Sequence, residues 1–190
     1  MFSLKKKYYL IIESIKDINL KNIKKRNKFV VIYRNHKNLE KKQEIFKFRK
    51  LCKLKSIDFY VANNIALAIN LNADGLYLSA FNKSYRSLFY KKYNFRVIGS
   101  AHNIKEIFMK INQGCDLILL SKLFLVNYDK RSKFLGVIKF NNFLNFNKNL
   151  IPLGGIKLDN LNKLKHINSK GIAIMSEIKK KPTKIFSRLF

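Results

Sequence analysis

The stretch that decides the fold reads Phe95-Arg-Val-Ile-Gly-Ser-Ala-His102. Its apolar, β-branched run stops at a glycine, which predicts a buried strand. Asn103 can cap a following helix, and Glu106, three residues on, completes a capping box. Helical spacing then gives that helix one apolar face, formed by Ile104, Ile107, Phe108 and Ile111. Ser100 and His102 are therefore expected at the carboxyl end of a strand, where parallel α/β folds place their ligand sites.

The same strand-then-helix unit recurs along the whole chain. Continuous apolar runs predict further strands at residues 8–12, 29–33, 57–61, 75–78, 116–120, 150–153 and 171–175. Helical patterns separate them at residues 17–26, 39–54, 65–71, 84–93, 134–144 and 159–167, with a last helix running to residue 190. Strands that are apolar throughout are buried on both faces, as in a parallel sheet. Eight such units predict a small (β/α)8 TIM barrel, with residues 1–190 forming a single domain.

Composition limits where the protein works. Hydrophobic residues make up 47% of the chain, so a disordered chain is excluded. Cys52 and Cys115 both lie in apolar contexts and are interpreted as reduced core thiols of a cytosolic protein. The apolar run at residues 8–12 is too short for a signal peptide, and no run reaches the ~20 apolar residues of a membrane span. We therefore expect a cytoplasmic protein that does not contact a membrane.

The formal net charge of +29 has two explanations. A strongly basic chain can bind nucleic acid or another anionic surface. The lysines are, however, spread along nearly every polar face, and the chain is also rich in Asn, Ile, Phe and Tyr, whose codons are AT-rich. We favour compositional bias over a nucleic-acid role. A small ligand that carries phosphate agrees with either explanation.

In a barrel, the carboxyl ends of the strands form one ring of groups at the mouth. The predicted ring contains Arg34, Asn63, Asn64, Ser79, Ser100, His102, Ser121, Lys122, Gly154, Gly155 and Ser176. The loops after the seventh and eighth strands, at Gly154-Gly155 and Met175-Ser176, are the usual phosphate site of this fold. Arg34 could clamp a phosphate, or it could be a solvated charge at the end of a strand.

His102 can be a proton carrier, because an unperturbed imidazole titrates near neutral pH. The alternative is a histidine that only forms a hydrogen bond near the start of a helix. A Ser/His hydrolase is not favoured, because the chain lacks a Gly-x-Ser-x-Gly nucleophile elbow. A zinc site is poorly supported. The three histidines, His36, His102 and His166, share no ligand spacing with either cysteine.

Six segments resemble, in this order, the motifs of the thiamine-phosphate synthase/TenI family of small barrels. They are Phe59-Tyr-Val-Ala-Asn-Asn-Ile-Ala-Leu-Ala68, Asn72-Ala-Asp-Gly-Leu-Tyr-Leu78, Ile98-Gly-Ser-Ala-His102, Gly114-Cys-Asp-Leu-Ile118, Ile151-Pro-Leu-Gly-Gly-Ile156 and Gly171-Ile-Ala-Ile-Met-Ser176. The third corresponds to the family's G-x-S-x-H and the fifth to a shortened I-P-x-x-x-I-G-G-I. Each motif is weak alone, but six in the right order are specific. The resemblance covers roughly residues 8–178 and implies a TIM barrel of thiamine biosynthesis.

The resemblance also implies ligands and roles. The family binds a phosphorylated thiazole, and its synthases also bind a pyrimidine pyrophosphate. In these synthases Mg²⁺ helps the pyrophosphate group to leave, and the thiazole nitrogen then captures the pyrimidine cation. The TenI branch tautomerises the thiazole, and its proton carrier corresponds to His102. By position Arg34 meets the pyrophosphate with help from Ser100 and from Lys130 or Lys133. The implied binding set, in which Gly155 and Ser176 hold the thiazole phosphate, is Arg34, Lys37, Asn63, Ser100, Lys130, Gly154, Gly155, Met175 and Ser176.

The chain departs from the family pattern at the implied metal site. The family's two magnesium aspartates correspond to Asn63 and Asn82, and because an amide is neutral, a divalent ion would lose two charged ligands. Tyr77 replaces the usual histidine of the fourth strand, and His36 stands where the family has a lysine, with Lys37 beside it. Mg²⁺ stays open as a cofactor, and no other cofactor is expected. A tautomerase that works without a metal would not need the two missing magnesium aspartates.

Three functional alternatives remain after this reasoning. The first is an enzyme of thiamine biosynthesis, either a synthase or a tautomerase. The second is a catalytically degenerate barrel that binds a phosphorylated thiamine precursor without changing it. The third, which we favour least, is a basic nucleic-acid-binding protein. A homo-oligomer is compatible with all three, and the sequence does not decide the oligomeric state.

Overall fold

The computed structural model of the protein describes residues 6–23, 27–35, 40–86, 88, 95–126 and 133–180. Most of the helix predicted at residues 84–93, and the part of the last helix beyond residue 180, lie outside these residues. The assignment of residues 1–190 to one domain stays a prediction.

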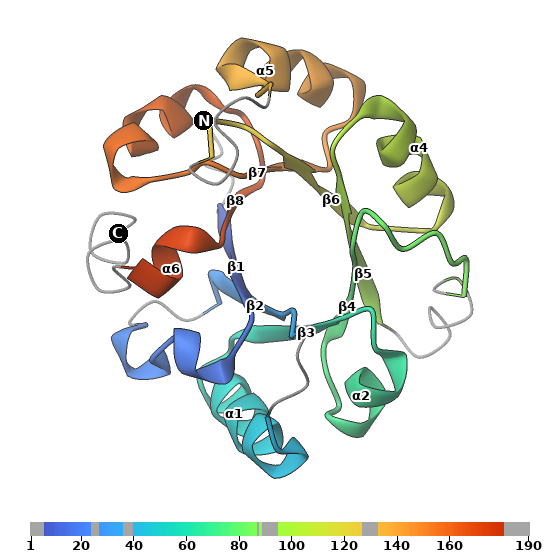
Figure 1. The fold of residues 1–190 in the computed structure, drawn as a ribbon, viewed down its shortest axis with the longest axis vertical. Coiled ribbons are helices and arrows are strands. Elements are labelled where there is room, and N and C mark those ends of the chain that lie inside the picture. Colours follow the sequence, from blue (N-terminus) through green and yellow to red (C-terminus); the bar gives the residue numbers. More distant parts are fainter. Residues whose placement is uncertain are drawn as a thin grey trace.

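Eight parallel strands form the sheet at the centre of the molecule, as predicted (Figure 1). They are β1 (Lys7–Ile12), β2 (Phe29–Tyr33), β3 (Asp58–Ala62), β4 (Gly75–Leu78), β5 (Arg96–Ala101), β6 (Leu117–Ser121), β7 (Leu150–Leu153) and β8 (Gly171–Ile174). The strands pair in the order β7-β6-β5-β4-β3-β2-β1-β8, and β7 also contacts β8. The sheet therefore curls into a nearly closed barrel, which confirms the predicted TIM-barrel architecture.

Helices surround the barrel on its outside (Figure 1). The α-helices are α1 (Lys42–Leu54), α2 (Ile65–Asn70), α4 (Ile104–Asn112), α5 (Gly136–Phe146) and α6 (Ser176–Lys180). The 3₁₀ helices are η1 (Ile15–Asp17), η2 (Leu20–Asn22) and η4 (Leu158–His166). Within the described residues, none of the helices combines the length and the apolar character that crossing a membrane requires.

Two predicted helices are 3₁₀ structures instead. The helix predicted at residues 17–26 is replaced, in its described part, by η1 and η2. Ser14 caps η1 and Asn19 caps η2, so two polar side chains start two separate single turns. The helix predicted at residues 159–167 is the 3₁₀ helix η4, and α5 begins two residues later than predicted. Short apolar spacing at i and i+3 suits both kinds of helix, so the sequence pattern did not separate them.

Alternate residues of each strand face two different cores. The barrel interior contains Tyr9, Ile11, Val30, Ile32, Tyr60, Tyr77, Ile98, Leu119, Ile151 and Ala173. The other face of the strands packs against the helices in a larger core that includes Leu10, Val31, Phe59, Leu76, Ile118 and Ile174. Burial on both faces explains why the strands are apolar throughout. Because side chains fill the interior, the barrel itself has no room for a ligand between its two ends.

Candidate functional site at the barrel mouth

Arg34 lies at the mouth, directly after β2. Val30 and Ile32 point into the barrel, so the two-residue period of the strand directs Arg34 to the same side. The pKa of the Tyr77 phenol is raised by burial, while hydrogen bonding by Ser100 and the charge and hydrogen bonding of Arg34 oppose that rise. The Nε atom of Arg34 is buried and makes no hydrogen bond. Arg34, Tyr77 and Ser100 thus form one polar group inside the mouth, with a donor to spare.

His102 lies on the neighbouring part of the rim, just after β5. Its Nδ1 lies 2.8 Å from the Oγ of Ser121, at the end of β6. Its backbone N–H donates to the carboxylate of Glu106 (2.8 Å), and Asn103 Oδ1 accepts from the Glu106 N–H (3.0 Å). The predicted cap is therefore present, but its carboxylate holds the backbone of His102 itself. The contact at Nδ1 leaves Nε2 as the ring nitrogen for a ligand.

A cationic cavity of about 520 Å³ opens beside His102. It lies where the start of α5 meets the carboxyl ends of β5 and β6, and it is lined by His102, Ser121, Lys122, Lys133, Phe134, Leu135 and Lys139. Three ammonium groups around one cavity suit an anionic ligand. Lys133 is one of the two lysines that the sequence offered for this role. The other, Lys130, lies outside the described residues, as does Lys37.

The glycine pair after β7 packs tightly against the loop after β6. Gly154 and Gly155 both have positive φ (91° and 68°), a conformation that favours glycine. A Cβ atom on Gly155 would lie 2.3 Å from the carbonyl oxygen of Phe124, and one on Gly154 would lie 3.2 Å from the Cα of Lys122. Packing alone therefore requires glycine at position 155, and the positive φ together with a tight contact favours it at position 154. Their turn also brings the end of β7 next to Lys122 and the cationic cavity.

The predicted residues after β8 are Met175 and Ser176, and they belong to neither hydrogen-bonded group described above. Met175 packs against the barrel interior, and Ser176 is exposed at the start of α6. Among the described residues, no hydrogen bond or ion pair joins Ser176 to Arg34 or to His102. The structure thus gathers Arg34 with Ser100, and His102 with the cationic cavity. Among the described residues, Ser176 makes no hydrogen bond to a side chain of either group.

The two asparagines that the sequence resemblance assigned to the family's metal positions are hydrogen-bonded to each other. Asn63 follows β3 with a φ of 55°, a left-handed conformation that asparagine tolerates. Its Oδ1 accepts from the Nδ2 of Asn82 (3.1 Å) and from the backbone N–H of Ser79 (3.1 Å). We call Asn63, Ser79 and Asn82 the amide bridge. It ties the end of β3 to the loop after β4, whose Phe81 ring lies 6.5 Å from the His102 ring.

A second polar cluster at the mouth has no counterpart in the sequence reasoning. The carboxylate of Glu40 accepts from the Ser14 hydroxyl (2.6 Å), the Ile15 N–H (2.8 Å), the Tyr33 hydroxyl and the Asn35 amide. We call these five residues the Glu40 clamp. Burial raises the pKa of Glu40, but the four hydrogen bonds outweigh it, so the net shift is downward. The clamp joins the loops after β1 and β2, and no local pattern indicated it.

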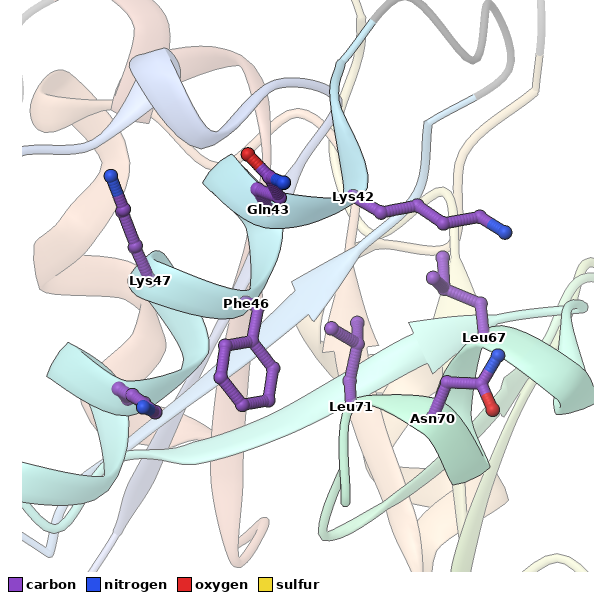
Figure 2. Close-up of a pocket in the computed structure, with 8 residues that line it drawn as sticks. Lys42, Gln43, Phe46, Lys47, Leu67, Asn70 and Leu71 are labelled. Carbon is purple, nitrogen blue, oxygen red and sulfur yellow. The ribbon is translucent and has the colours of Figure 1, made fainter.

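A further groove lies outside the barrel, between α1 and α2 (Figure 2). Its volume is about 420 Å³, and Figure 2 shows Phe46 and Leu71 facing each other across it. Lysines line its edge, and the ammonium of Lys50 lies 4.7 Å from the centre of the Phe46 ring. None of the residues that line this groove is a predicted site residue. The candidate functional site is therefore the mouth.

Comparisons with known proteins agree with this architecture. A family profile described as thiamine monophosphate synthase matches residues 9–178. A thiamine-phosphate synthase of Prochlorococcus marinus (strain AS9601) is 34% identical over 145 residues, which is 72% of this chain and 39% of the relative. One of Bacillus cereus (strain B4264) is 28% identical over 67% of this chain and 60% of its own length.

The fold comparison covers nearly the whole chain. A solved structure of a thiamine phosphate pyrophosphorylase from Pyrococcus furiosus superposes with a TM-score of 0.72 over 98% of both chains, at 17% identity. The chain spans about two-fifths of the length of the two Prochlorococcus relatives that it matches. The profile match nevertheless extends over most of its residues. The chain belongs to the thiamine monophosphate synthase family.

Proposed function

We propose that this protein is a synthase that joins a thiazole phosphate to a pyrimidine carrying a diphosphate. The observation that carries this proposal is Arg34, a guanidinium at the mouth that interacts with the Tyr77 hydroxyl and has a buried Nε that makes no hydrogen bond. A guanidinium with a spare donor suits a diphosphate oxygen. The names of the curated relatives support the same reaction class.

The charges at the mouth suit the proposed reaction. The bond between the pyrimidine's methylene carbon and the diphosphate oxygen breaks, and the diphosphate leaves with the bonding electrons. The thiazole nitrogen then gives its lone pair to that carbon, so a C–N bond forms. Arg34 and the lysines of the cationic cavity, Lys122 among them, stabilise the leaving diphosphate. The backbone N–H groups near Gly154 and Gly155, together with Met175 and Ser176, are proposed to face the thiazole phosphate.

A second candidate, tautomerisation of the thiazole phosphate, is favoured by one contact. The Ser121 hydroxyl orients the His102 ring through Nδ1, so Nε2 can take a proton from one ring position of the thiazole and return it to another. This reaction uses His102 as the catalytic residue. In the joining reaction, His102 only lines the cavity that binds the substrate.

One set of assays separates these functions. Purified protein is incubated with thiazole phosphate alone, and with thiazole phosphate plus pyrimidine diphosphate, and products are followed by chromatography. We expect the joined product. We also expect Arg34→Ala to lower its rate about 100-fold or more, because a charge on the leaving group is no longer compensated. Arg86→Ala, which removes an exposed arginine of the same chain, is the matched control and should leave the rate unchanged.

His102 decides between the two reactions. If the joining proposal is correct, His102→Ala slows product formation only severalfold. If the protein is a tautomerase, the same change abolishes isomerisation, and no joined product forms in any variant. A third result, a rise in Tm with thiazole phosphate and no product in either assay, identifies a binding protein without chemistry. Either of the last two results overturns the proposed synthase.

A further inference from the structure

The hydrogen-bond inventory of the amide bridge does not fit a divalent cation. Asn63 Oδ1 already accepts two hydrogen bonds, from Ser79 and Asn82, which is the number its two lone pairs allow. Asn82 Oδ1 accepts from the Ser84 N–H at 2.9 Å, and Asn82 Nδ2 points its hydrogens at Asn63. A cation between these side chains would meet an NH₂ group and no negative charge. Mg²⁺ binds through carboxylate oxygens in near-ideal octahedral geometry, and this pair supplies neither.

The surrounding residues supply no alternative set of ligands. Among the residues that the structure describes, no group of three or more His, Cys, Asp or Glu side chains could hold a metal ion. The loop after β4 is instead held by two buried side chains, one from α4 (Lys110) and one from its C-cap residue (Gln113). The Lys110 ammonium, completely buried, donates to the carbonyl oxygen of Asn82 (2.7 Å), and Gln113 Nε2 donates to the same oxygen (2.9 Å). The loop therefore rests on a buried, hydrogen-bonded amino group.

This arrangement holds the loop close to His102. Gln113 Nε2 also reaches the carbonyl oxygen of Ser84 (3.0 Å), so both ends of the Asn82–Ser84 segment are held. Phe81, one residue before Asn82, lies next to the His102 ring. Hydrogen bonds from Lys110 and Gln113, and to Asn63, thus hold the loop after β4 at the mouth.

We propose that the Asn63–Asn82 amide pair, anchored by Lys110 and Gln113, takes the structural place of the divalent ion in this barrel, and that the mouth acts on its anionic ligand without a divalent metal. The positive charge that the ligand needs comes from Arg34 and the cationic cavity. The functional half of this statement rests on the proposed synthase. The structural half does not, because it concerns cation binding by the mouth itself. Asn63, Asn82 and Lys110 act as positioning residues.

The test measures Mn²⁺ binding directly, by the loss of the free-ion EPR signal and by calorimetry. The wild-type protein should show no saturable one-to-one binding up to millimolar Mn²⁺. The double variant Asn63→Asp, Asn82→Asp should gain a site that is at least about tenfold tighter than any wild-type binding, because ligand charge controls affinity. The matched control Asn70→Asp, Asn112→Asp adds the same two charges at exposed helical positions and should gain none.

Saturable one-to-one binding of Mn²⁺ by the wild type that Asn63→Ala removes would overturn the proposal. If the double variant does not fold, as judged by its circular dichroism and melting transition, the single variant Asn82→Asp replaces it. That variant keeps the Ser79 contact to Asn63, and it should also bind Mn²⁺ more tightly than the wild type. Equal affinity in the variant and the wild type would contradict the inference.

Turnover provides an independent readout. If the protein joins its two substrates, the rate in EDTA should equal the rate in Mg²⁺ within about twofold, and the Tm should not depend on Mg²⁺. Activity that EDTA abolishes and Mg²⁺ restores would overturn the inference while leaving the synthase intact. If no product forms under any condition, the proposed function fails, and the Mn²⁺ measurement still decides whether the amide pair excludes the ion.

Discussion

Two neighbouring junctions at the mouth differ in the groups that form them: one is built around a carboxylate and the other only from neutral side chains. The loops after β1 and β2 are joined by the Glu40 clamp, in which one carboxylate accepts four hydrogen bonds. The loops after β3 and β4 are joined by the amide bridge, in which every member is neutral. The first junction contains a group that titrates and the second does not. The stability contributed by the Glu40 clamp should therefore depend on pH and on the charge of Glu40, and that contributed by the amide bridge should not.

Removing the carboxylate of the Glu40 clamp should have the largest effect. Glu40→Ala takes the shared acceptor from Ser14, Ile15 and Tyr33, and hydrogen bonds to a charged group are the stronger kind. We expect the free energy of unfolding, measured by urea denaturation, to fall by about 3 kcal/mol. Glu44→Ala, at an exposed position of α1, is the control and should change it by less than about 0.5 kcal/mol. Equal losses in both variants would show that the clamp contributes nothing specific.

Removing the buried ammonium of Lys110, which holds the loop of the amide bridge, should have the second-largest effect on stability. Lys110→Met keeps an unbranched apolar stem but removes the ammonium that Asn82 and Gln113 accept from. We expect a loss of about 2 kcal/mol in the free energy of unfolding, with faster hydrogen exchange in the loop after β4. Lys105→Met, at an exposed position of the same helix, should leave both measurements unchanged. Unchanged exchange in the Lys110 variant would mean that the loop is held by other contacts.

The pH dependence of stability separates the two junctions most directly. The pKa of Glu40 is lowered in the folded protein, so its stabilisation is fully present above the ordinary carboxyl value of 4.5 and is lost as the pH falls through the lowered pKa. Glu40→Gln has no such titration. The difference in stability between the wild type and this variant should therefore be constant above about pH 5.5 and shrink below pH 4.5.

The matched measurement on the other rim uses Asn82→Ala. Because the amide bridge does not titrate, the stability difference between this variant and the wild type should be the same at pH 4 and pH 7. A difference that shrinks with acid would show that a carboxylate contributes to that rim, contrary to the geometry. Thermal melts in a series of buffers at constant ionic strength give both curves.

The strand framework was predictable because burial on both faces leaves a strong local signal. Residues 29–33, for example, are continuously apolar, and all five are buried in β2. The residues at strand ends were predictable for the same reason. Once β2 is placed, the two-residue period directs Arg34 inward, and once β5 is placed, Ser100 and His102 follow. The type of the short helices was not predictable, because a single turn with apolar residues at i and i+3 suits either an α-helix or a 3₁₀ helix.

The junctions themselves could not be predicted, because their partners are far apart in the chain. Ser14 and Glu40 are separated by 26 residues, and Asn82 and Lys110 by 28. Lysine is among the residue types that are rarely buried, and in a chain with 40 lysines and arginines nothing marked Lys110 as an internal cation. The resemblance to the family implied that Asn63 and Asn82 stand at the positions of two aspartates. It could not show that the two amides bond to each other, since that depends on the closure of the barrel.

The smallest expected effect concerns Phe81, and it separates loop position from loop stability. The side chain is 87% exposed, so Phe81→Ala removes almost no buried area and should change the free energy of unfolding by less than about 0.5 kcal/mol. The same ring lies beside His102 on a loop that the amide bridge holds at the mouth, so a heteroaromatic ligand there would lose an aromatic neighbour. We expect kcat/KM to fall about threefold to tenfold, since one ring contact contributes about 1 kcal/mol.

Ile138→Ala, which removes another exposed side chain (81%), should change neither quantity. A large loss of stability in the Phe81 variant would mean that the ring packs within the loop, whereas unchanged kinetics would mean that the amide bridge positions the loop without placing this ring against the ligand.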